Sequence, residues 1–241
     1  KGNELLWANI EQMVNFPWIL DSDYFMDPLA FEPDLTPSDG SLSLDGAIRK
    51  LIIDFWPDFD YAEGLINLFT SFTSDTGYGE GKSFFTFPYD WRYGASDDIV
   101  TQLKETIDSV LAQTGADKVH IIAHSTGGLV TKKYIAEHPG DHRIDKAVFL
   151  GVPNLGAPKA FKVLINGDNF GVVAILNPLE MKKIAQNMPV AYDLAPSEEY
   201  GAQIGSFMRV VDNVTKSDLE TDYDEAITRM QSQSLINPLG V

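Results

Sequence analysis

VHIIAHSTGG, residues 119–128, places a serine on a turn between an apolar strand and a helix. Small residues lie two positions before and two positions after this serine, at Ala123 and Gly127. The small-x-Ser-x-Gly spacing is typical of a nucleophile elbow, in which a strained turn projects a serine hydroxyl from the top of a parallel sheet. We therefore predict Ser125 as a nucleophile with a positive φ. The Thr126 N–H, at the start of the following helix, is the predicted oxyanion donor.

The segments around this stretch alternate between strands and helices. Strands are predicted at 83–87, 118–123 and 147–151, with a helix from the Ser96 N-cap to Gly115 and another over 129–138. This order is typical of a parallel sheet with helices on its faces, so the sequence predicts an α/β fold with a mostly parallel sheet. Interpreting Ser125 as a simple helix cap explains the motif alone, but not the strand and helices around it.

The rest of the chain differs from this pattern. Residues 1–80 carry apolar residues at helical spacing in three places, namely 5–13, 48–55 and 65–72. We predict a core over residues 1–156 that includes this helical excursion. Residues 157–241 are predicted as a helical cap, with helices at 181–186 and near the C-terminal end, and an extended loop at 188–197.

Charge and composition exclude several functions. The 241 residues carry a net charge of −17 and no cysteine. A phosphate backbone or an anionic membrane surface would be repelled, so neither nucleic acid nor strong anionic-membrane binding is expected. Without cysteine, disulfides and thiol catalysis are excluded. The sequence implies no metal and no cofactor, and it does not decide the compartment or the oligomeric state.

Four motifs in order resemble the lecithin:cholesterol acyltransferase family of α/β-hydrolases, including its bacterial lipase-like relatives. They are FPYDWR (87–92), VHIIAHSTGGLV (119–130), VFLGVPNLGAPKAF (148–161), and NGDNFGV (166–172) with PVAYDLAPS (189–197). The resemblance implies a lipid-like ester substrate, an acyl-enzyme on Ser125, and water or an alcohol as the acceptor. It also implies a helical cap inserted in an α/β-hydrolase fold, and it favours an extracellular location.

The resemblance also implies parts that we do not find in this chain. In that family a Pro-Gly loop with a second oxyanion donor precedes a segment like Trp7–Asn9, and an aspartate and a histidine follow two further strands. We therefore expect a fold incomplete at both ends, with the triad acid and base outside these residues. Residues 1–241 alone are expected to be inactive or weak.

The four histidines support this expectation. His120 is predicted to pack in the core, and the His124 side chain is predicted to face away from the nucleophile. His138 lies about 11 residues along a helix from Ser125, on the order of 16 Å at 1.5 Å per residue, and His142 lies on the same side. A base must come within about 3 Å of the serine hydroxyl, so none of the four is expected to serve.

Candidate substrate-binding residues are Tyr89, Trp91 and His124. Tyr89 and Trp91 follow a predicted strand at the sheet edge where open α/β folds bind ligands. Alternatively, this loop is structural, with Asp90 paired to Arg92. Residues 161–194 form either a mobile gate or an ordinary packed insert. Two other functions stay open: hydrolysis of non-lipid esters on the same fold, and a non-catalytic binding protein.

Overall fold

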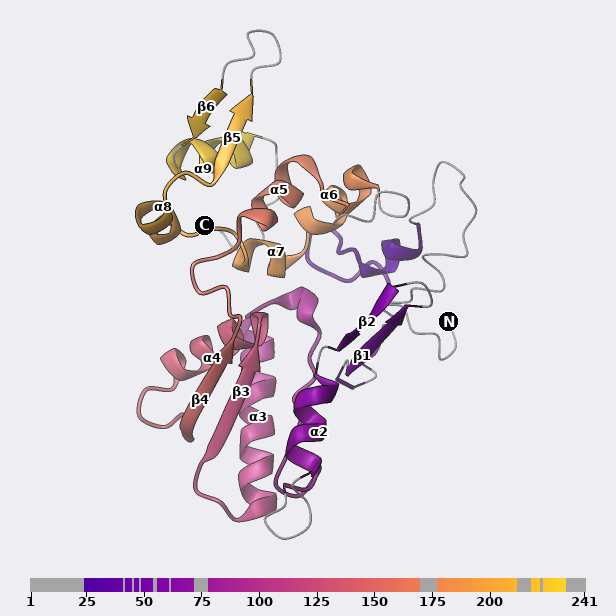
Figure 1. Ribbon diagram of the computed structural model, residues 1–241, viewed down its shortest axis with the longest axis vertical. Coiled ribbons are helices and arrows are strands. Elements are labelled where there is room, and N and C mark those ends of the chain that lie inside the picture. Colours follow the sequence, from indigo (N-terminus) through magenta and orange to yellow (C-terminus); the bar gives the residue numbers. More distant parts are fainter. Residues whose placement is uncertain are drawn as a thin grey trace. The chain divides into compact units, whose positions relative to one another are not determined.

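The computed structural model describes residues 24–40, 42–44, 46–47, 49–53, 56–60, 62–71, 78–169, 177–211, 218–221 and 223–232. They form two compact units (Figure 1). The first unit contains the described residues of Ser43–Trp91 and Ala95–Val152; the second contains those of residues 24–42, Arg92–Gly94 and Pro153–Val241. Within the described part of the chain, no helix is both long and apolar enough to cross a membrane. The predicted division at residue 156 stays a prediction.

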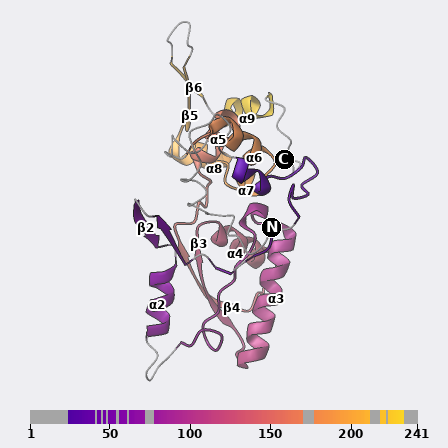
Figure 2. The ribbon, with the colours of Figure 1, turned by 90° about the vertical axis from the view of Figure 1, so that its right-hand side faces the viewer.

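A parallel strand pair forms the centre of the first unit. Strand β3 (Val119–His124) pairs with β4 (Ile144–Leu150), and Ala123 lies opposite Phe149. Helix α3 (Asp97–Thr114) precedes β3, and α4 (Thr126–Glu137) connects β3 to β4. Figure 2 shows α3 and α4 on one side of the strand pair. This strand–helix–strand unit confirms the parallel pairing that the alternation predicts.

Helix α3 confirms the expected boundaries. Its apolar residues recur at helical spacing and are buried, namely Ile99, Val100, Leu103, Ile107 and Leu111. Gly115 ends the helix with a φ of 70°, a conformation that favours glycine. Ser96 is extended at the N-cap position, but its side chain makes no capping hydrogen bond, and its buried Oγ has no hydrogen-bond partner among the described residues.

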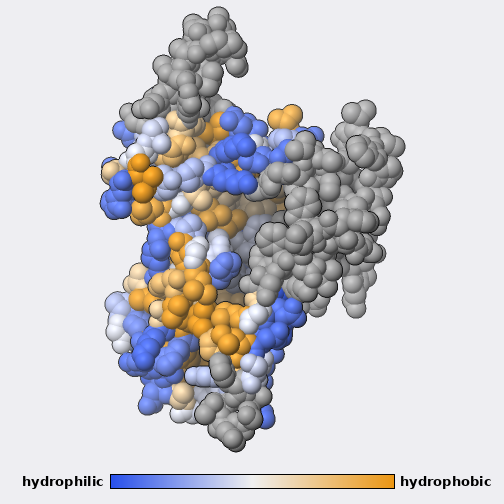
Figure 3. Space-filling view, in the orientation of Figure 1, coloured by the Kyte–Doolittle hydropathy of each residue, from blue (hydrophilic) through white to orange (hydrophobic). Residues whose placement is uncertain are grey.

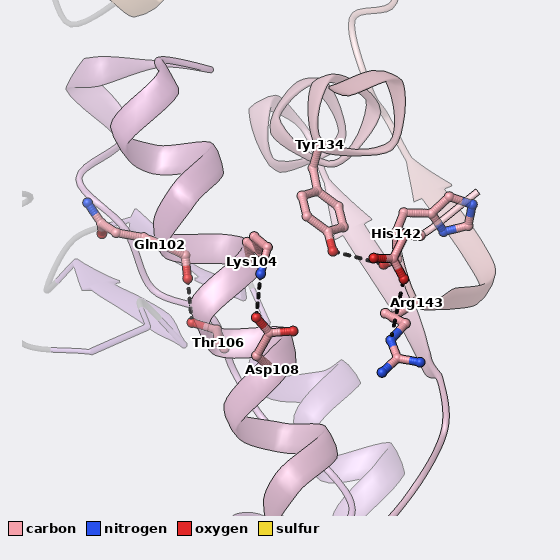
Figure 4. Close-up of polar contacts among 8 residues, drawn as sticks. Gln102, Lys104, Thr106, Asp108, Tyr134, His142 and Arg143 are labelled. Carbon is pink, nitrogen blue, oxygen red and sulfur yellow. Dashed lines mark hydrogen bonds and ion pairs between the residues drawn. The ribbon is translucent and has the colours of Figure 1, made fainter. Parts of the chain in front are cut away.

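An ion pair joins helices α3 and α4 of this unit. Lys133 Nζ on α4 lies 2.5 Å from Asp97 Oδ1 and 2.9 Å from the Ala95 carbonyl oxygen. The hydrogen bond from Lys133 lowers the pKa of the Asp97 carboxyl below its ordinary value. Figure 4 shows a further contact of α4 from the next residue, where the Tyr134 hydroxyl donates to the His142 carbonyl oxygen at 2.9 Å.

An antiparallel hairpin precedes these elements, where a helix was predicted. Strands β1 (Lys50–Ile53) and β2 (Trp56–Asp60) pair with each other, so the helical interpretation of residues 48–55 is wrong. A short apolar run fits a strand as well as a helix, and Leu-Ile-Ile is rich in β-branched residues. Helix α2 (Glu63–Ser71) follows, as its apolar spacing predicts. The helix predicted within residues 5–13 lies outside the described residues.

The strand predicted at 83–87 is also wrong. Phe84 makes only an isolated bridge with Glu80, and residues 85–90 have no regular secondary structure. Their aromatic composition favoured a strand, but composition alone supplies no partner for the backbone groups. The Gln113 side chain at the end of α3 donates to the Gly81 carbonyl oxygen at 2.8 Å and holds the start of this segment.

One face of the β3–β4 pair is exposed. His120 is the clearest departure from the prediction, since it does not pack in the core: its side chain is 60% exposed and its Nε2 lies 3.0 Å from Asp145 Oδ2. Large apolar side chains are exposed on the same strands, namely Ile122, Val148, Phe149 and Leu150. Figure 3 shows a hydrophobic patch over this strand pair. Within the described residues no other strand pairs with β3 or β4.

A buried arginine, Arg92, contacts the first described residues of the second unit. Arg92, in the 3-10 helix Trp91–Tyr93, is 4% exposed and donates to the carbonyl oxygens of Leu29 at 3.3 Å and Pro28 at 3.4 Å. Its Cζ lies 4.9 Å from the centre of the Phe31 ring, a cation–π geometry. These contacts hold the 3-10 helix Tyr24–Leu29 and the residues after it. The proposed pairing of Arg92 with Asp90 stays a prediction.

Three short helices supply the core of the second unit. Helix α5 (Pro158–Asn166) packs against α6 (Pro178–Gln186) and α7 (Pro189–Asp193). Their buried side chains include Val163, Leu164, Ala185 and Ala191. The predicted helix at 181–186 is confirmed, but the extended loop at 188–197 is wrong in its first half. Pro189 occupies the first position of α7, where its fixed φ suits a helix start.

The C-terminal part adds a second core and a hairpin. Strands β5 (Met208–Val211) and β6 (Asp218–Thr221) pair antiparallel, in a region that was predicted as a helical cap. Helix α8 (Glu198–Ile204) precedes them and α9 (Tyr223–Ser232) follows, as predicted for the C-terminal end. Phe161 and Ile165 of α5 pack with Ala226 of α9. The described part of residues 161–194 is packed, and its role as a mobile gate stays a prediction.

Candidate active site

Ser125 lies on a strained turn between β3 and α4. Its φ is 52° and its ψ is −129°, which confirms the predicted positive φ. Such a backbone conformation costs a non-glycine residue about 1–3 kcal/mol and persists only where the surrounding structure imposes it. Two hydrogen bonds do so here: the Ser125 N–H donates to the Leu150 carbonyl oxygen, and the Gly128 N–H donates to the Ser125 carbonyl oxygen, both at 3.0 Å.

The first residue of α4 carries an unused donor. An N–H in the first turn of a helix has no acceptor within that helix. The Thr126 N–H follows this rule, because it donates to no acceptor among the described residues. The positive end of the helix dipole lies at the same place and favours a developing negative charge. The arrangement suits the binding of an oxyanion beside the Ser125 hydroxyl.

The motif predicts that Gly127 must be small, but close packing excludes a side chain at the next residue, Gly128. A Cβ atom on Gly127 would meet only the Tyr89 hydroxyl, at 3.9 Å, which is an ordinary contact. A Cβ on Gly128 would lie 2.1 Å from Val152 Cγ2. Ala123, the small residue before the serine, is buried as expected. Val152 was not among the predicted site residues. The second of the two adjacent glycines, Gly128, is the sequence feature that indicates a close neighbour at this turn.

The four histidines are all described, and none hydrogen-bonds to the Ser125 hydroxyl. His120 contacts Asp145, His138 Nδ1 lies 2.9 Å from the Tyr134 carbonyl oxygen, and His142 Nδ1 accepts from the Ile144 N–H at 3.1 Å. His124 is exposed at the end of β3. No base is therefore placed on the serine within the described part of the chain.

Two of the three candidate substrate-binding residues, Tyr89 and His124, flank the turn in the first unit. The Tyr89 hydroxyl lies 3.0 Å from Thr126 Oγ1, and His124 directly precedes Ser125. Trp91 is half-buried at the start of the 3-10 helix Trp91–Tyr93. The contact between Tyr89 and Thr126 joins residues 37 positions apart, and no sequence pattern predicted it. Substrate contact by these residues stays a prediction.

Among the described residues, no group of three or more His, Cys, Asp or Glu side chains is arranged to hold a metal ion. A serine hydroxyl on a strained turn, beside an unused N–H at a helix N-terminus, is an arrangement that suits nucleophilic acyl transfer.

Comparison with known proteins supports the same class. Residues 62–237 match the sequence profile described as lecithin:cholesterol acyltransferase. Mouse phosphatidylcholine-sterol acyltransferase is 32% identical over 114 residues, which cover 45% of this chain and 26% of the relative. Phospholipase A(1) LCAT3 of Arabidopsis thaliana is 25% identical over 174 residues, covering 67% and 38%. Bovine lysosomal phospholipase A and acyltransferase is 26% identical over 136 residues, covering 52% and 33%.

The matched family is one of α/β-hydrolases, and the parallel β3–β4 pair with its flanking helices is consistent with that fold. The chain belongs to the lecithin:cholesterol acyltransferase family. The predicted family is confirmed. The matched regions span 26% to 38% of the length of these relatives.

Proposed function

We propose that Ser125 is the nucleophile of an enzyme that transfers or hydrolyses the acyl group of a lipid-like ester. The backbone of Ser125 carries this proposal, because a φ of 52° on a strand-to-helix turn costs energy and is typical of a nucleophile elbow. The Ser125 oxygen attacks the ester carbonyl, and the Thr126 N–H stabilises the negative charge that develops on the carbonyl oxygen. The alcohol leaves, and an acyl-enzyme forms.

Water or an alcohol then takes the acyl group from Ser125. Attack by water completes hydrolysis, whereas attack by an alcohol yields a new ester. The base that accepts the serine proton is, in this proposal, none of His120, His124, His138 and His142, because three of them hydrogen-bond to other groups and no hydrogen bond joins His124 to the Ser125 hydroxyl.

The substrate class rests on the relatives. Their names include a phosphatidylcholine-sterol acyltransferase and a phospholipase A(1), which supports a phospholipid as the acyl donor here. The fold alone does not decide the substrate. A short-chain ester that contains no lipid is the competing substrate, and lipid binding without turnover is the competing function.

The test is an acyl-transfer assay with the protein as its organism produces it. Phosphatidylcholine vesicles with a labelled acyl chain are incubated with and without a sterol, and the label is followed into fatty acid and sterol ester. We expect label in at least one product, and none above background with Ser125→Ala. Turnover of short p-nitrophenyl esters but not of the phospholipid would support the non-lipid substrate. Binding of the vesicles with no turnover of either substrate would support the binding function.

A further inference from the structure

The Thr126 N–H can stabilise an oxyanion only if its direction is fixed. The peptide between Ser125 and Thr126 begins the helix, and its carbonyl oxygen accepts from the Gly128 N–H at 3.0 Å, whereas its own N–H makes no hydrogen bond among the described residues. Preorganised donors contribute more to catalysis than mobile ones, because their orientation costs nothing at the moment of reaction. A side-chain anchor on Thr126 would add a constraint on the nitrogen side of this peptide.

The Tyr89 hydroxyl provides that anchor. It lies 3.0 Å from Thr126 Oγ1, a distance at which either oxygen donates to the other. Threonine is branched at Cβ, so its χ1 has few rotamers and fixing Oγ1 also restrains the Cα and the backbone nitrogen. The adjacent Gly127 leaves room for the phenol, whose oxygen lies 3.9 Å from the place of a Cβ.

Tyr89 is itself held in place by an aromatic neighbour. Its ring stacks on that of Phe87, with the ring centres 5.5 Å apart and the planes 18° apart. Stacked aromatic pairs with this spacing are favourable beyond the area that they bury. The ring of Phe87, the phenol of Tyr89 and the hydroxyl of Thr126 thus form a chain of contacts that ends at the turn.

We propose that Tyr89 is a positioning residue that orients the Thr126 N–H through the Thr126 hydroxyl. This assignment rests on the proposed function of Ser125, and it differs from the role predicted from the sequence, in which Tyr89 forms a wall of the substrate pocket. The two roles differ in kinetics. Loss of a positioning contact lowers kcat, whereas loss of a wall of the pocket raises KM.

The experiment measures kcat and KM for a soluble p-nitrophenyl ester with the protein as its organism produces it. Tyr89→Phe keeps the ring and removes the hydroxyl, and Thr126→Val keeps the shape and removes its partner. We expect each variant to lower kcat about tenfold, with KM within about twofold. The double variant should be about as slow as either single variant, because both remove one contact. Thr126→Ser should recover most of the kcat lost in Thr126→Val.

Tyr134→Phe is the matched control. It removes a tyrosine hydrogen bond of 2.9 Å at the other end of the same helix and should leave kcat unchanged. A rise in KM without a fall in kcat, losses that multiply in the double variant, or an equal fall in Tyr134→Phe would each overturn the inference. An inactive Ser125→Ala beside a fully active Tyr89→Phe would overturn this inference alone. A fully active Ser125→Ala would overturn the proposed function with it.

Discussion

The side chain of Val152 occupies the space that a side chain on Gly128 would need. A Cβ on Gly128 would lie 2.1 Å from Val152 Cγ2 and 2.7 Å from Cγ1. Val152 follows β4, and Gly128 lies in the first turn of α4, so the contact holds the start of the helix against the end of the strand pair. The turn at Ser125 lies between these elements and depends on their separation.

Gly128→Ala should therefore destabilise the protein, while Gly127→Ala should not. Overpacking of this kind typically costs about 1–3 kcal/mol. At Gly127 the new methyl group makes only an ordinary contact, and alanine gains roughly 0.5–1 kcal/mol in a helix. Urea unfolding of the two variants beside the unmodified protein measures the difference. Equal stability of the two variants would contradict the packing that we describe.

Substitution by alanine should change the stability of the protein differently at two N-cap serines, Ser96 and Ser197. Ser96 makes no capping bond, and its buried Oγ has no partner in the part of the chain that the structure describes. Ser197 Oγ, in contrast, accepts from the Tyr200 N–H at 3.2 Å. Ser197→Ala should cost about 1 kcal/mol, the usual effect of losing an N-cap. Ser96→Ala should cost nothing or stabilise slightly, because it removes an unpaired buried hydroxyl. Thermal unfolding of each variant is the measurement, and a larger loss at Ser96 would contradict the assignment.

Ionisation of the Tyr192 hydroxyl should lower the stability of the folded protein at alkaline pH. Burial raises the pKa of Tyr192 to about 12, and its hydroxyl donates to the Gln186 carbonyl oxygen at 2.6 Å. An unfolded tyrosine ionises near pH 10, so the unfolded state loses its proton first. The contribution of Tyr192 is therefore complete below about pH 10 and declines as the pH rises toward 12.

The variant Tyr192→Phe tests this pH dependence. It should be less stable than the unmodified protein near neutral pH, because it lacks the hydrogen bond to Gln186. That difference in the free energy of unfolding should shrink as the pH rises from about 10 to about 12. A difference that stays constant over this range would show that the phenol ionises equally in both states.

A helix was predictable from the sequence where neighbouring residues mark its start, its buried face and its end. Helix α3 combines a buried apolar stripe, acidic residues in its first turn and a terminal Gly115, and these agree on the same boundaries. The elbow was predictable for a similar reason, since Ser125, Ala123 and the adjacent glycines are neighbours in sequence. Local sequence decides both features.

Features that depend on distant partners were not predictable in this way. The run at residues 50–53 forms a strand because it pairs with β2, and spacing alone favoured a helix. Pro189 begins a helix, although proline also ends them. His120 lies in a strand of apolar residues, yet its ring is exposed beside Asp145. The contact of Tyr89 with Thr126 joins two segments that no local rule connects.

Residues 1–241 alone should be a poor catalyst. A serine hydroxyl without an adjacent base is a weak nucleophile, and no described histidine hydrogen-bonds to Ser125. Removal of triad members typically lowers kcat by about 10⁴ to 10⁶. Hydrolysis of a p-nitrophenyl ester by these residues should therefore barely exceed that of the Ser125→Ala control. Turnover far above the control would show that a histidine does reach the serine, and His124 would be the first to substitute.

Covalent labelling of the protein as its organism produces it tests the role of Ser125 most directly. A fluorophosphonate with a lipid-like chain phosphonylates an activated serine and releases fluoride. Trypsin then releases Ser125 in the peptide of residues 119–132, because Lys118 and Lys132 flank it. Mass spectrometry should find one phosphonyl group on Ser125 of that peptide, and no labelling of Ser125→Ala. A label on a different residue, or undiminished labelling of Ser125→Ala, would contradict the account.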